Sequence, residues 1–202
     1  MSPRGLAPKL IASLCIVAAL VLWQGEALMQ HLLRPIAQTI DALDRHHQVI
    51  ALDITQVEAD TVIRMEAGIR ELILTGTHVT FADPRARAVI TTPLAAFWLA
   101  PSVLLALLMA WPASSIAASL WRLPLAVPAL ACVLLLDTPF VLDALLWGLH
   151  RDAHDPNGTS TILVWSAFLK AGGRFLLGAA AAAAVITLSH AIATRMHRGA
   201  SR

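Results

Sequence analysis

Apolar residues occur along this chain in four long blocks separated by one extended polar region. The blocks run over residues 10–23, 89–111, 124–149 and 161–193. A helix that crosses a bilayer needs about 20 mostly apolar residues, because lipid offers no hydrogen-bond partners to the backbone. The pattern predicts four membrane-spanning helices, with residues 24–88 as the one long segment outside the bilayer.

Within this polar region the hydrophobic period changes once. Six apolar residues recur at three- and four-residue steps, which predicts an amphipathic helix that ends near Arg45 and has Pro35 as a kink or a break: Leu28, Leu32, Leu33, Ile36, Ile40 and Leu43. From Val49 the period is two, and a further run covers 72–81 with a turn at 75–77. The second half therefore predicts a β-meander of three or four strands. Such a small sheet buries too little apolar surface to be stable alone, so it should pack on the preceding helix, the membrane or another protein.

The composition supports the same class. Hydrophobic residues make up 57% of the 202 residues and charged residues 14%, whereas a soluble domain has roughly 25% charged residues. We therefore predict an α-helical integral membrane protein with a small extracytoplasmic helix-plus-β-meander domain. The lipid bilayer is its first partner, and the net charge of +2 reflects topology and does not indicate nucleic-acid binding.

The predicted organisation has four parts. Residues 1–23 form an N-terminal anchor, 24–88 the extracytoplasmic domain, 89–193 a three-helix transmembrane region and 194–202 a basic tail. The first block, preceded by basic residues, has an alternative interpretation as a cleaved signal peptide. Cleavage would change the number of spans and leave the outer domain where it is.

The orientation follows from basic residues in short loops, which stay on the cytoplasmic side. These residues precede the first span, separate the second from the third and follow the fourth: Arg4, Lys9, Arg122, Arg195, Arg198 and Arg202. Both termini are thus predicted to be cytoplasmic. In a bacterial inner membrane, residues 24–88 would then be periplasmic.

Four charged residues lie at apparent membrane depth, namely Asp137 and Asp143 on the third span and Lys170 and Arg174 on the fourth. A charge in hydrocarbon costs roughly 2.5–3.5 kcal/mol on insertion scales, so it is usually paired. We expect an acidic–basic contact between these two helices. Arg174 would face Asp137 if the fourth span begins near Thr161, and Asp143 if it begins near Gly172. The alternative is an ion or proton path through the same residues.

Small residues on the fourth span have two interpretations. Gly172, Gly173, Gly178 and the run 179–184 would let another helix approach closely. They would equally suit an alanine-rich helix that faces lipid.

No catalytic, metal or cofactor site is predicted. His150 and His154 are weak metal candidates beside Asp152 and Asp155, but Pro156 and Gly158 predict a loop there that is not helical. The pair His46-His47 is interpreted as a solvated helix end. Cys15 and Cys132 are expected within hydrocarbon, where a thiol stays neutral and behaves as an apolar side chain.

Several short segments carry a resemblance to a known family. They are Thr92-Pro93-Leu94, Phe97-Trp98-Leu99-Ala100-Pro101, the run 104–112 and Gly172-Gly173-Arg174-Phe175. With the order of anchor, outer domain and apolar region, they resemble the exosortase-associated membrane proteins of bacteria, in particular the exosortase H-type group. The resemblance implies an accessory role beside an exosortase-type membrane transpeptidase and carries over no catalytic residues.

Three hypotheses follow for the function. The leading one is a non-catalytic inner-membrane accessory protein whose outer domain contacts another membrane protein in envelope protein sorting. The second is a transporter or channel component that uses Asp137, Asp143, Lys170 and Arg174. The third is a membrane enzyme that uses the 150–155 loop.

Overall fold

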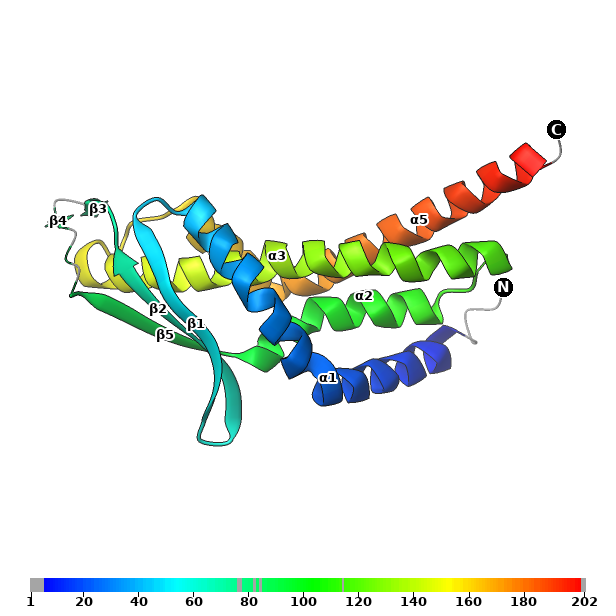
Figure 1. Cartoon of the computed structure of the whole chain (residues 1–202), viewed down its shortest axis with the longest axis horizontal. Coiled ribbons are helices and arrows are strands. Elements are labelled where there is room, and N and C mark those ends of the chain that lie inside the picture. The colour runs from blue at the N-terminus through cyan, green and yellow to red at the C-terminus, as the bar shows by residue number, and fades with distance from the viewer. Residues whose placement is uncertain (1–5, 76–77, 82, 84, 114, 201–202) are drawn as a thin grey trace. The chain divides into compact units, whose positions relative to one another are not determined.

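A computed structural model describes residues 6–200 apart from 76–77, 82, 84 and 114. These residues form a mostly helical protein with a small antiparallel sheet (Figure 1). The chain divides into two compact units. One unit comprises Met1–Gln24, Trp98–Leu134 and Gly173–Arg202, and the other Gly25–Phe97 and Leu135–Gly172.

Within the described residues, three long helices are apolar enough to cross a membrane: Ala7–Leu43, Ile116–His154 and Thr161–Met196. They confirm a multi-pass membrane protein. Helix α1 (Leu6–Leu43) joins the predicted anchor and the predicted amphipathic helix without interruption at Pro35. Its 38 residues rise about 57 Å, well beyond the ~30 Å of bilayer hydrocarbon. Helix α1 is therefore longer than a single bilayer crossing requires.

The second predicted span is shorter than the sequence pattern indicates. Residues 89–93 belong to strand β5 (Arg87–Pro93), and the helical part consists of a 3-10 turn, η2 (Leu94–Trp98), and α2 (Leu99–Ala110). The residues Val89-Ile90-Thr91-Thr92 are all β-branched and favour a strand, whose pairing extends the sheet up to Pro93. The third predicted span begins earlier and ends later than expected, as α3 (Ile116–His154).

The main sheet has three antiparallel strands in the order β1 (His47–Val57), β2 (Asp60–Ile69) and β5. The predicted third strand at 72–81 is wrong as a member of this sheet. This run forms a separate ribbon of β3 (Ile73–Thr75) and β4 (His78–Thr80), while residues 76–77 of the predicted turn lie outside the described residues. Arms of three residues are too short to compete with the continuous β-branched run of β5 for the edge of β2.

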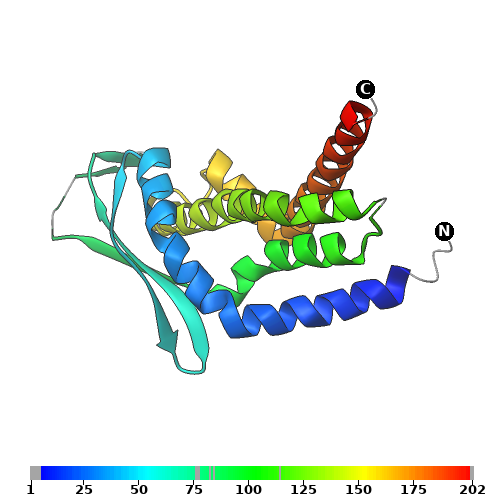
Figure 2. The same ribbon diagram turned by 45° about the vertical axis from the view of Figure 1, so that its right-hand side comes forward.

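The sheet packs on the second half of α1. Ile63, Met65 and Ala67 of β2 are buried on one face, and Ile36 and Ile40 of α1 are also buried. The second half of α1 lies beside β1 and β2 in both views (Figures 1 and 2). The sheet is therefore supported by the preceding helix, as its small size predicts.

Helices α2 and α5 (Arg174–Ala200) pack closely in the other unit. Gly178 is buried, and a Cβ built on it would lie 2.4 Å from the carbonyl oxygen of Ala100. Ala182 lies in the same core as Leu104 and Leu108. Gly178 and Ala182 thus lie in a helix–helix contact, whereas a Cβ built on Gly172 meets no atom within 4 Å and Ala180, Ala183 and Ala184 are exposed. Each of the two interpretations of the small residues therefore fits part of the run.

The fourth predicted span is kinked. Helix α4 (Thr161–Phe168) is followed by a π-helical turn, η3 (Leu169–Gly173), in which Gly172 has a φ of 112°. Side chains other than glycine rarely adopt this left-handed conformation. Of the two possible starts of the span, Thr161 begins α4, whereas Gly172 lies in the kink itself and the next helix, α5, begins at Arg174.

Candidate functional site

The end of α1 directs two polar side chains into the protein. The backbone N–H of Asp44 donates to the Ile40 carbonyl oxygen at 2.9 Å, and Asp44 Oδ1 accepts from the backbone N–H of His46 at 2.8 Å. This aspartate turn ends the helix and leads into β1 at His47 within three residues. The Asp44 and His47 side chains are only 4% and 1% exposed. The sequence at this helix end thus creates a buried acid–imidazole pair.

Helix α3 contributes the other residues of the site, which follow Asp44 by more than 90 positions in the sequence. Asp44 Oδ2 lies 2.5 Å from His47 Nδ1 and accepts a hydrogen bond of 3.0 Å from Trp147 Nε1. Asp143, one helical turn before Trp147, is 2% exposed. One ligand atom each from Asp44, His47 and Asp143 lies within 4.8 Å of the other two. These three residues are called the Asp44 cluster below.

The Asp44 cluster concentrates negative charge. Burial by itself raises the pKa of Asp44, but the hydrogen bonds from the His47 ring and the His46 backbone outweigh it and hold this pKa below its ordinary value. Among the described residues, no lysine or arginine forms an ion pair with Asp44 or Asp143. Two carboxylates in contact need a proton or a cation between them. The cluster is therefore chemically suited to hold a positive species.

Aromatic and imidazole rings surround the cluster. The Trp147 ring meets the His46 and His47 rings edge-on, with centroids 5.8 and 5.6 Å apart. The His150 ring lies 5.1 Å from that of His47. His150 Nδ1 lies 3.2 Å from the Leu146 carbonyl oxygen. A carbonyl only accepts, so Nδ1 carries the hydrogen and Nε2 of the neutral ring keeps its lone pair.

The four membrane-depth charges predicted from the sequence do not gather at one place. Asp143 contacts Asp44 and lies near His47, so its predicted pairing with a basic residue of the fourth span is corrected. Lys170 is exposed. Asp137 and Arg174 are both buried, and neither is without an interaction partner. Their pairing with each other stays a prediction.

The histidine predictions also change. Helix α3 continues through His154, so the expected loop after residue 149 begins five residues later. His154 is exposed and lies outside the cluster, whereas His150 is half-buried beside His47. His47 is buried and part of the cluster, which corrects the interpretation of His46-His47 as a solvated helix end.

Sequence reasoning missed Asp44 and His47. A usable signal is present in the spacing, because an Asp three residues before a His at the end of an amphipathic helix fits a capping turn that brings the two side chains together. Asp143 and Trp147 share a helix face through their four-residue spacing. Nothing in the sequence indicates that these two pairs meet.

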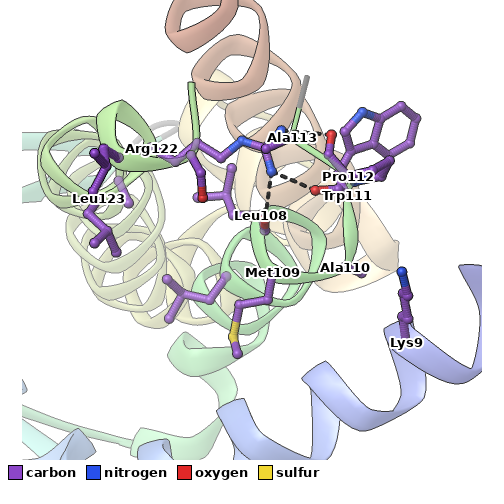
Figure 3. Close-up of a pocket in the computed structure, with 13 residues that line it drawn as sticks. Lys9, Leu108, Met109, Ala110, Trp111, Pro112, Ala113, Arg122 and Leu123 are labelled. Carbon is purple, nitrogen blue, oxygen red and sulfur yellow. Dashed lines mark hydrogen bonds between the residues drawn. The ribbon is translucent and has the colours of Figure 1, made fainter. Parts of the chain in front are cut away.

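Arg122 organises a second polar site, at the start of α3. It was predicted in the loop before the third span but lies within the helix. Its Nη1 donates to the carbonyl oxygens of Trp111 at 2.5 Å and Leu108 at 3.3 Å, and its Nη2 donates to that of Pro112 at 3.0 Å (Figure 3). These carbonyls lie at or just beyond the end of α2, where the helix itself offers no donors. Arg122 therefore caps α2. It also lines a pocket of about 670 Å³, in which Lys9 is the second basic residue.

Replacing Arg122 with methionine is expected to destabilise the protein by about 2–3 kcal/mol, because hydrogen bonds to a charged group are lost and carbonyls at the end of α2 remain unpaired. Arg122→Lys should recover only part of this loss, since an ammonium group lacks the planar fork. Thermal unfolding of the detergent-solubilised protein measures both variants. Lys9→Met is the control, because Lys9 lines the same pocket but is exposed. Equal shifts for the two methionine variants would contradict the capping role.

No protein-family model, curated protein sequence or solved structure matches this chain. The features of the chain that bear on its function are the long apolar helices, the edges of the small sheet and the Asp44 cluster. The helices establish contact with the lipid bilayer.

Proposed function

We propose that the chain is a non-catalytic accessory protein of the bacterial inner membrane that binds another membrane protein through the edge of its small sheet. The observation that carries this proposal is the strand order β1-β2-β5, in which β1 pairs on one side only within the described residues. Strand β1 has 11 residues. Near its start the Val49 N–H already donates to Asp41 Oδ1, so the outer side presents a row of backbone donors and acceptors from about residue 51 to Val57.

An open edge of this kind is a ready template for a strand from another chain. Ile50 and Val57 of β1 are 46% and 48% exposed. Backbone hydrogen bonds to an added strand supply affinity, and apolar side chains beside the edge supply specificity. Strand β1 follows α1 after only three residues, so the edge is tethered directly to a membrane-anchored helix, which favours a partner that is itself a membrane protein.

The family resemblance supplies a specific partner to test. If the chain acts as the exosortase-associated proteins do, the partner is an exosortase-type membrane transpeptidase that processes proteins with a C-terminal sorting signal. This role requires the predicted orientation, with both termini cytoplasmic and residues 24–88 periplasmic. The apolar helices support the multi-pass anchor that such a role needs.

The test is site-specific photocrosslinking in cells that produce the full chain, with a photoreactive residue at position 56 on β1. We expect one membrane protein to be crosslinked in this way. Val57→Lys should lower the yield about tenfold or more, because burying one valine side chain contributes about 1.5–3 kcal/mol and 1.4 kcal/mol is a factor of ten.

Val89→Lys is the matched control, because Val89 is equally exposed at 49% but lies on β5, at the opposite edge of the sheet. It should leave the crosslink unchanged. Crosslinks to lipid or to the chain itself alone would overturn the proposal. Equal losses for both lysine variants would place the contact elsewhere than at the β1 edge.

A further inference from the structure

We propose that Asp44, His47 and Asp143 bind a divalent transition-metal ion such as Zn²⁺. Two carboxylates and an imidazole are ligands that zinc accepts in proteins. Imidazole favours zinc and its first-row neighbours over Mg²⁺ and Ca²⁺, which prefer oxygen ligands throughout. The proposal does not depend on the partner protein proposed above.

The geometry is close to that of an occupied site. The three ligand atoms lie within 4.8 Å of one another. Ligands bound to zinc at roughly 2.0–2.2 Å can be at most about 4.2–4.4 Å apart. Side-chain movements of less than about 1 Å would therefore bring all three atoms into the coordination sphere. All three side chains are at least nine-tenths buried, so no large structural change is required to exclude water from the ion.

Two unpaired polar atoms point independently to a missing ligand. Asp143 Oδ1 and His47 Nε2 are buried, and no described residue gives either atom a hydrogen bond. Leaving such atoms unpaired costs about 1–3 kcal/mol each, and more for a charged group. A metal ion would engage lone pairs of these two atoms and offset that cost.

The charge of the site matches that of a divalent ion. When a metal displaces the proton shared by the two carboxylates, both are ionised and with a neutral imidazole they carry a charge of −2, and no lysine or arginine of the described residues pairs with them. A dication neutralises this charge in full. It also removes the repulsion between Asp44 and Asp143 that a shared proton reduces only in part.

Neighbouring residues supply the outer contacts of a metal site. The Trp147 indole N–H donates to Asp44 Oδ2 and fixes that carboxylate, as hydrogen bonds commonly do around metal ligands. His150 uses Nδ1 on the Leu146 carbonyl oxygen and leaves Nε2 available 5.1 Å, ring to ring, from His47. His150 is thus a candidate for a fourth ligand, although it lies outside the group of ligand atoms within 4.8 Å of one another. An ion here would join the start of β1 to α3 within one unit and hold the sheet in place.

The test is metal binding by the full-length protein, purified in detergent, stripped with EDTA and titrated with Zn²⁺. We expect about one zinc per chain by elemental analysis and a higher melting temperature with zinc, because an ion that binds only the folded state stabilises it. Co²⁺ in place of Zn²⁺ should give visible absorption bands of nitrogen and oxygen coordination. Asp143→Asn should weaken binding by roughly 10–100-fold or more, since changes even to outer contacts cost that much.

Asp53→Asn is the matched control, because Asp53 is exposed on β1 and outside the cluster. It should bind zinc as the unchanged protein does. If Asp143→Asn does not fold, His47→Gln and the titration of the unchanged protein still decide the question. Absence of zinc binding by the unchanged protein, or equal binding by the Asp143 and Asp53 variants, would overturn the proposal.

Discussion

Asp44→Ala is expected to destabilise the protein by about 2–4 kcal/mol, because it leaves several buried donors without an acceptor. The variant removes the hydrogen bonds to the His47 ring, the Trp147 indole and the backbone N–H of His46. It also opens the turn that leads from α1 to β1. Denaturant unfolding in detergent, followed by tryptophan fluorescence, measures the effect, and the Trp147 indole reports on the cluster because it donates to Asp44 Oδ2.

Two comparisons separate the role of Asp44 from a general effect of losing a charge. Asp53→Ala removes an exposed acid from the neighbouring strand and should change stability by less than about 0.5 kcal/mol. Asp44→Asn keeps one carbonyl oxygen as acceptor, so its destabilising effect should lie between those of Asp44→Ala and Asp53→Ala. If Asp44→Ala were no more harmful than Asp53→Ala, the cluster would not hold α1, β1 and α3 together.

Gly178→Leu is expected to destabilise the α2–α5 contact by about 3 kcal/mol or more, and Gly178→Ala by about 1–3 kcal/mol. A Cβ at this position would lie 2.4 Å from the Ala100 carbonyl oxygen and 3.0 Å from Val103 Cβ. The first of these neighbours is backbone, so relief requires α2 and α5 to move apart. Thermal unfolding and the fraction of monodisperse protein after solubilisation provide the measurement.

Gly148→Ala is a sensitive control for this prediction. Gly148 also lies in a helix, but a Cβ there meets no atom within 4 Å. Alanine favours a helix over glycine by roughly 1 kcal/mol, so Gly148→Ala should be neutral or stabilising. The changes in stability of the two alanine variants are thus expected to have opposite signs. A stabilising Gly178→Ala would mean that the two helices do not approach as closely as described.

The family resemblance and the orientation remain predictions, whereas several corrections follow from tertiary structure. Residues 72–81 and 87–93 both have strand-forming patterns, and the sequence favoured the first as the third strand. Strand β2 instead pairs with β5, because seven residues in register offer more hydrogen bonds than two arms of three. Which of two segments pairs with β2 depends on hydrogen bonding across the sheet. It cannot be predicted from the sequence of either segment alone.

The sequence by itself determined the membrane class, the long apolar helices and the presence of a small strand-rich region. These properties depend on hydrophobic period and length, which are local to each segment. Only the tertiary structure decided that Asp143 meets the acid Asp44 and not a base, and that His47 is buried. Asp44 and Trp147 are 103 positions apart, and a contact over that distance arises from how the helices and the sheet pack together.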